Sequence, residues 1–185
     1  QIYAKKGVCI GACMQQPYSS AWFGGFSNAD ILRPEVTKLL LENTYEAYYQ
    51  RFQSEFGDSI PAVFSDEPGI SPGCVYLEDP MVFPFSRYLS SEFYRRRGYS
   101  MEDNMVSIVL DIDGVPGGIP AEQVRFDYYC TLRELWIENF AKPIRDWCQL
   151  HNIVWTGHFL DEHWPYPWGN CSPAVMSMYE YMQWP

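Results

Sequence analysis

The sequence of 185 residues lacks several features that mark large protein classes. It contains no run of the roughly 20 apolar residues that a membrane-spanning helix requires, so we expect no membrane span. Basic residues are few, 13 against 23 acidic ones, and the formal net charge is −10. The densest basic run, Arg95–Arg97, ends a predicted helix, where cations favour the helix dipole. Because phosphate binding requires a patch of clustered Lys and Arg, we expect no nucleic-acid partner.

The six cysteines lack the Cys-x-x-Cys spacing of zinc ribbons and of thioredoxin-type redox motifs. They are Cys9, Cys13, Cys74, Cys130, Cys148 and Cys171. An even number permits disulfides without requiring them, so cysteine usage leaves the cellular compartment open. The sequence begins at Gln1 and lacks the long apolar core of a signal peptide. We therefore expect a chain that starts after processing or inside a longer polypeptide with further domains.

Hydrophobic residues make up 47% and aromatic residues 17% of the sequence, which predicts a folded chain with a substantial core. Pro34 and Gly57 mark the beginning and end of a predicted helix. Along it, a stripe of residues at a spacing of four is apolar except for Thr44: Val36, Leu40, Thr44, Tyr48, Phe52 and Phe56. The apolar run 60–64 then predicts a buried strand. A second helix over 121–150, with a kink or restart at Pro143, precedes a second strand over 153–160.

Helix, buried strand and polar loop thus follow one another twice, as in parallel α/β proteins. We divide the chain into a loop-rich segment 1–29, a helix–strand unit 30–69, an insertion 70–123, and a helix–strand unit with its exit loop, 124–185. A complete (β/α)8 barrel needs eight strands and at least about 200 residues. The sequence therefore predicts a single, partial (β/α)8 TIM-barrel-type catalytic domain with long insertions after its strands.

Acidic residues follow both predicted strands, at the barrel end where active sites lie. Asp66 and Glu67 follow the first strand. A carboxylate in that position can serve as a general acid, although a helix cap or a salt bridge to Arg is the alternative. After the second strand, His158 and Glu162 share one face of the extended chain and can both point into the barrel mouth. A hydrogen-bonded core histidine is the alternative for His158, and Gly157 leaves room for a ligand or for a neighbouring backbone.

A metal site is an alternative at the second strand end, because His158, Asp161, Glu162 and His163 are all possible ligands. The spacing differs, however, from the His-x-x-Glu-His motif of inverted zincins. Aromatic residues in the following loop, Trp164, Tyr166 and Trp168, favour a sugar site instead. Flat sugar faces stack on aromatic rings, and carboxylates bind their hydroxyl groups.

Several blocks resemble, in order, the glycoside hydrolases related to the family 106 α-L-rhamnosidases. They are Asp30–Thr37, Tyr45–Tyr49, Phe56–Pro68, Arg97–Tyr99, Val124–Tyr128, Asp146–Cys148 and Thr156–Glu162. In that family the first block reads Asp-x-Leu-Asn-Pro-Glu and the third ends in Gly-x-Phe-Thr-Asp-Glu-Pro. This chain departs from the family pattern with Arg33 for Asn, Ser65 for Thr, and Glu162-His163 for Glu-Glu.

The resemblance implies a (β/α)8 catalytic barrel that acts on glycosides of polysaccharides or oligosaccharides. It implies Glu67 as general acid and Glu162 as the second carboxylate or base. The sugar-binding residues that we expect with them are Asp66, His158, Asp161, His163, Trp164 and Trp168. Some relatives bind sugar hydroxyls through calcium, but the sequence itself indicates no cofactor. A non-catalytic carbohydrate-binding barrel module and a metal-dependent hydrolase are the alternatives to a glycosidase.

Overall fold

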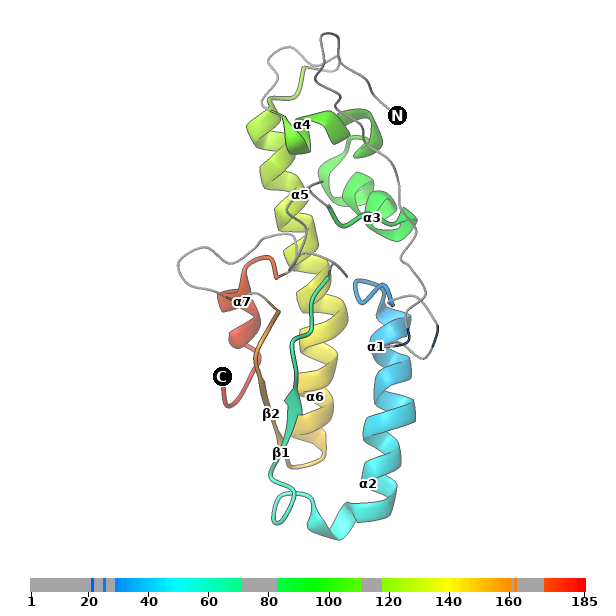
Figure 1. The fold of residues 1–185 in the computed structure, drawn as a ribbon, viewed down its shortest axis with the longest axis vertical. Coiled ribbons are helices and arrows are strands. Elements are labelled where there is room, and N and C mark those ends of the chain that lie inside the picture. Colours follow the sequence, from blue (N-terminus) through cyan, green and yellow to red (C-terminus); the bar gives the residue numbers. More distant parts are fainter. Residues whose placement is uncertain are drawn as a thin grey trace.

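The computed structural model describes residues 21, 25, 29–70, 83–110, 118–160, 162 and 172–185. The first helical column consists of α1 (Pro34–Leu40), a π-helical turn (Leu41–Tyr45) and α2 (Glu46–Phe52). The second column is longer and lies beside the first in Figure 1: α5 (Ala121–Trp136), a π-helical turn (Ile137–Ala141) and α6 (Lys142–Leu150). The strand β2 (Val154–Gly157) packs against α6 and pairs with β1 (Ala62–Ser65).

The first column begins and ends as its sequence predicts. Pro34 is its first residue, and a 3₁₀ turn (Gln53–Glu55) leads to Gly57, whose φ of +83° is left-handed. The spacing-four residues do not form its packed face, because Tyr48 remains 60% exposed while Thr37 is buried. Each step of four residues overshoots one turn by about 40°, so such a stripe winds around the helix. Tyr45 and Tyr49 make the contact with Trp147 of α6 instead.

The second column changes its helical type next to Pro143, where the sequence predicts a kink or a restart. Proline has no N–H, so it cannot donate to the carbonyl group four residues earlier. The π-helical turn Ile137–Ala141 lies immediately before it, and the amide of Lys142 donates to the carbonyl of Ile137. The column therefore continues through the proline with a locally wider turn rather than ending there.

The described part of the insertion forms helices that pack on α5. Ser86 caps α3 (Arg87–Arg97) by accepting the amide of Leu89 at 3.1 Å, and Gly98 ends it with a left-handed φ of +82°. Ser100 accepts the amide of Asp103 at 3.1 Å and so caps the next helical turn. A 3₁₀ turn (Glu102–Asn104) and α4 (Met105–Val109) follow.

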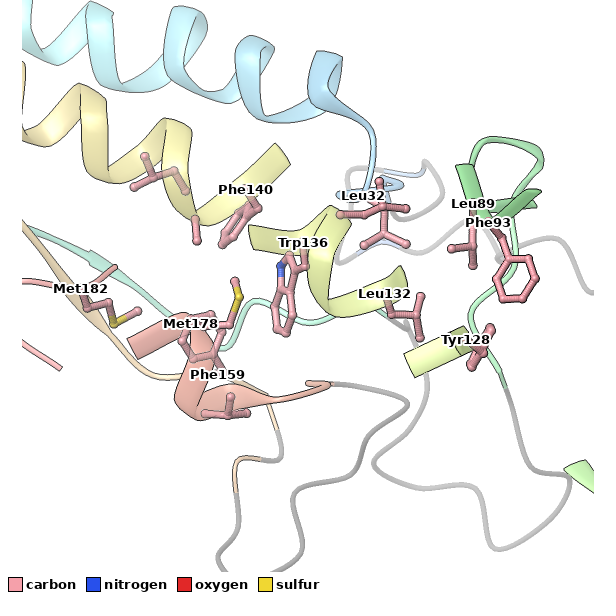
Figure 2. Close-up of a cluster of buried hydrophobic side chains, with 14 of the residues drawn as sticks. Leu32, Leu89, Phe93, Tyr128, Leu132, Trp136, Phe140, Phe159, Met178 and Met182 are labelled. Atoms are coloured by element: carbon pink, nitrogen blue, oxygen red, sulfur yellow. The ribbon is translucent and has the colours of Figure 1, made fainter. Parts of the chain in front are cut away.

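One buried cluster connects these elements (Figure 2). Leu89 and Phe93 of α3 pack at the Tyr128 end of the column, and Trp136 and Phe140 pack farther along it toward Phe159. Met178, from α7 (Val175–Tyr179), belongs to the same cluster. None of the described helices combines the length and apolar composition that a membrane span requires.

The two strands form a parallel pair in which Ala62 lies opposite Val154 and Ser65 lies opposite Gly157. β2 falls within the predicted segment 153–160, whereas β1 overlaps the predicted run 60–64 and extends one residue past it, to Ser65; each strand is only four residues long. At the far edge of β2, Thr156 makes a parallel bridge to Trp184. The described residues thus form a mixed helix and strand fold with parallel pairing, and the eight-stranded barrel stays a prediction.

Candidate active site

The two predicted catalytic segments meet at the carboxyl ends of the paired strands. Asp66 and Glu67 directly follow β1, and His158 directly follows β2. Pairing continues past the strand ends, because the amide of His158 donates to the carbonyl of Ser65 at 3.2 Å and that of Leu160 donates to the carbonyl of Pro68 at 3.3 Å. Parallel strands in register place their carboxyl ends side by side, which brings residues far apart in the sequence into one site.

Gly157 permits this close approach of the two chains. Its φ is +139°, outside the range that residues with a side chain adopt, and a Cβ built there would overlap the carbonyl oxygen of Ser65. Of the two roles expected for this glycine, the structure therefore supports room for a neighbouring backbone. The Ser65 hydroxyl also ties the strands together, because it accepts a hydrogen bond from Nε1 of Trp155 at 2.8 Å.

The imidazole of His158 lies between two carboxylates. Nε2 is 3.1 Å from Oδ1 of Asp66, and Nδ1 is 3.8 Å from Oε1 of Glu162. The side chain of His158 is 37% exposed, that of Glu162 31%, and that of Asp66 82%. A neutral imidazole donates from one nitrogen only, whereas a protonated one donates from both. His158 is thus an accessible side chain that lies between the two strand ends, and it is not a core histidine.

Glu162 is fixed by two donors on its other oxygen. The amide of Phe159 donates to Oε2 at 3.0 Å, and the hydroxyl of Tyr179 donates to the same atom. Burial raises the pKa of the Tyr179 phenol, and its hydrogen bond to Glu162 and the charge of that carboxylate raise it further. Tyr179 belongs to α7 and was not predicted, because no motif or spacing in the sequence connects it with Glu162.

Glu67 has the most unusual backbone of the site. Its φ is +48°, one of the few positive values among described residues other than glycine. Such conformations cost on the order of 1–3 kcal/mol and gather at functional sites. Its side chain is exposed, and no described residue forms a hydrogen bond or ion pair with it. The carboxyl group is therefore free to contact a ligand in front of the strand ends.

The other predicted sugar-binding residues, Asp161, His163, Trp164 and Trp168, lie outside the described residues. In the described part of the chain, no three His, Cys, Asp or Glu side chains are placed to hold a metal ion together.

A separate open hollow of about 570 Å³ lies over α5. Its lining residues are Arg125, Phe126, Tyr129, Cys130, Arg133, Pro173 and Ala174. None of them belongs to the strand-end group, so this hollow and the candidate active site are different places on the molecule.

Comparisons with protein-family models, with curated proteins and with solved structures gave no match to this chain. The resemblance to the family 106 enzymes therefore rests on the sequence blocks alone. The functional argument that follows rests on the geometry of the strand ends and on the chemistry of their residues.

Proposed function

We propose that this protein is a glycoside hydrolase that cleaves a glycosidic bond with two carboxylates, Glu67 and Glu162. The observation that carries the proposal is the position of His158, 3.1 Å from Asp66 and 3.8 Å from Glu162. It brings the acidic residues of two adjacent strand ends into one group. Hydrolysis of a sugar–oxygen bond uses two carboxylates that flank the bond. Accessible carboxylates at neighbouring strand ends can supply such a pair.

The surroundings of the two glutamates suit different roles. Glu162 accepts two hydrogen bonds on Oε2, which hold the carboxylate in one orientation and suit the role of the group that takes a proton from water or attacks the anomeric carbon. Glu67 accepts no hydrogen bond from the described residues and is exposed, so a leaving oxygen can reach its carboxyl group, and we assign it the role of general acid. Glu67 then protonates the leaving oxygen as the glycosidic bond breaks, and water supplies the hydroxyl group of the product.

Asp66 and His158 are the sugar-binding residues of this proposal. Both are accessible, and hydroxyl groups of a sugar can donate to the Asp66 carboxylate and exchange hydrogen bonds with the imidazole. The resemblance noted above makes α-L-rhamnosides the first substrates to examine. The distance between the carboxylates in a substrate complex sets the outcome, roughly 5–5.5 Å for retention and 6.5–9.5 Å for inversion.

One observation favours a second function, a non-catalytic carbohydrate-binding module. The Asp66 side chain is 82% exposed, and Glu67 is exposed as well. A general acid usually needs desolvation to keep its proton near neutral pH, whereas a binding carboxylate does not. A binding module would keep its sugar affinity when Glu67 is changed and would hydrolyse nothing in either form.

A panel of aryl glycosides that includes rhamnosides tests the proposal with Glu67→Gln as the variant. Turnover by the unchanged protein and a loss of roughly 10²–10⁴-fold in kcat for Glu67→Gln are expected. Glu122→Gln is the matched control, because Glu122 is an exposed glutamate at the start of α5. Sugar binding without turnover would contradict the hydrolase and support the binding module.

A further inference from the structure

The hydroxyl group of Tyr179 and the carboxylate of Glu162 form the contact that joins α7 to the candidate active site. The hydrogen bond from Tyr179 ends on Oε2, the atom that also accepts the amide of Phe159 at 3.0 Å. With Oε2 held by two donors, Oε1 is left on the side of His158, 3.8 Å from Nδ1. The orientation of the carboxylate is thus set from outside the strand ends.

The tyrosine itself is held firmly by its neighbours. Its ring meets that of Phe159 edge to face, with centroids 5.4 Å apart, and Phe159 is buried. Met178, the preceding residue of α7, is fully buried in the main cluster (Figure 2). The segment before α7 is tied to the same strand end, because the Ser172 hydroxyl donates to the carbonyl of Leu160. A hydroxyl group carried on so fixed a ring can hold a carboxylate in one orientation.

We propose that Tyr179 is a positioning residue that holds Glu162 in the orientation from which its free oxygen serves the reaction. This inference rests on the proposed function, because that proposal gives Glu162 its part in the reaction. The contact between Tyr179 and Glu162 can nevertheless be measured without any substrate. Glu162 is the group at this site that faces the phenol, since Phe159 contributes a ring and an amide without charge. The next residue along the chain, Glu180, is exposed.

The activity test compares Tyr179→Phe with Tyr181→Phe. The first change removes only the hydroxyl group that contacts Glu162. The second removes the same atom from a ring that instead lies near Lys142 and Arg145. Loss of a group that orients a functional residue typically costs about 10–100-fold. We expect that decrease in kcat for Tyr179→Phe, with KM within about twofold, and no change for Tyr181→Phe. Equal kcat for both variants would overturn the positioning role.

A second measurement reads the contact directly. In the protein with ¹³C-labelled tyrosine, NMR follows the ionisation of each phenol, and Tyr179→Phe identifies the Tyr179 signal. Glu162→Gln removes the charge that raises the pKa of Tyr179, so that pKa is expected to fall, though burial keeps it above 10. Glu180→Gln, the matched control, is expected to leave it unchanged. An unchanged pKa in Glu162→Gln would overturn the inference.

The two measurements separate failure of the inference from failure of the proposed function. If no glycoside is hydrolysed while the pKa of Tyr179 falls in Glu162→Gln, the proposed function fails and the tyrosine still holds the carboxylate. If glycosides are hydrolysed and Tyr179→Phe is fully active, the function stands and the positioning role is wrong.

Discussion

The imidazole of His158 lies 3.1 Å from the carboxylate of Asp66, although 92 residues separate them in the sequence. The distance is short because Ser65 and Gly157 are opposite one another at the ends of two parallel strands. Each residue follows its strand directly, so the geometry of the site depends on the backbone contact between the strands. Substitutions at that contact are therefore expected to affect both folding and the site.

Gly157→Ala is expected to destabilise the protein by about 2–4 kcal/mol, because it combines a strained φ with a steric overlap. The overlap is with backbone atoms of Ser65, which cannot move without breaking the strand pair. Urea unfolding followed by circular dichroism measures the free energy of unfolding.

Gly98→Ala is the control for the Gly157 experiment. Gly98 also has a left-handed φ, +82°, but a Cβ there meets open space. Its cost is expected to be only about 1–2 kcal/mol, the cost of the left-handed conformation alone. Equal losses at the two glycines would contradict the steric explanation.

At Glu67 the usual order of Ala and Gly is expected to reverse. In a left-handed conformation, Ala keeps the steric cost that Gly avoids, so Glu67→Gly is expected to be more stable than Glu67→Ala by about 1 kcal/mol. At Gln50, an exposed position of α2, the order is expected to be normal, with Gly less stable than Ala by about 1 kcal/mol. Thermal unfolding of the four variants measures both differences, and the same order at both positions would disprove strain at Glu67.

Much of the secondary structure is predictable because short-range signals determine it. Pro34, Gly57 and Gly98 mark helix ends through constraints that act within a few residues. The two strands are apolar runs bounded by polar or turn residues, and their parallel pairing brings Asp66, His158 and Glu162 together as predicted strand-end residues.

Features that depend on packing between distant segments are not predictable in this way. The packed face of the first helical column differs from its spacing-four stripe, because more than one side of that column carries apolar residues. The face that packs is the one that meets Trp147, and it contains Tyr45 and Tyr49. Tyr179 reaches Glu162 only because α7 packs on the main cluster. The sequence contains both residues but no local pattern that pairs them.

The buried thiol of Cys148 is expected to make stability fall at alkaline pH. Burial raises the pKa of Cys148 to about 12. In the unfolded chain a thiol ionises near pH 8.5. Between these values the unfolded chain loses a proton that the folded protein keeps, so the free energy of unfolding decreases by up to about 1.4 kcal/mol per pH unit.

The comparison of the unchanged protein with Cys148→Ala isolates this effect, since all other ionising groups are common to both. Between about pH 7.5 and pH 10, the unchanged protein is expected to lose about 2 kcal/mol more than the variant. Urea unfolding at both pH values gives the four free energies. A parallel decline in the two proteins would contradict the assignment of the alkaline loss to Cys148.

Arg96 is expected to be the ion-pairing residue on which the attachment of α3 to α5 depends most. Only 13% of its side chain is exposed, and it bonds to Glu134 at 3.0 Å, to Glu138 at 3.1 Å and to Glu92 at 3.3 Å. Arg96→Lys keeps the charge but loses the planar group that reaches three carboxylates, so a loss of about 1–3 kcal/mol is expected. Arg95→Lys is the matched control, because Arg95 is 62% exposed and its one ion pair with a described residue is to Glu92. An exposed pair contributes little, so its loss is expected to be much smaller than that of Arg96→Lys. Equal losses from the two variants, measured by urea unfolding, would contradict the role of Arg96 in attaching α3 to α5 and the following turn.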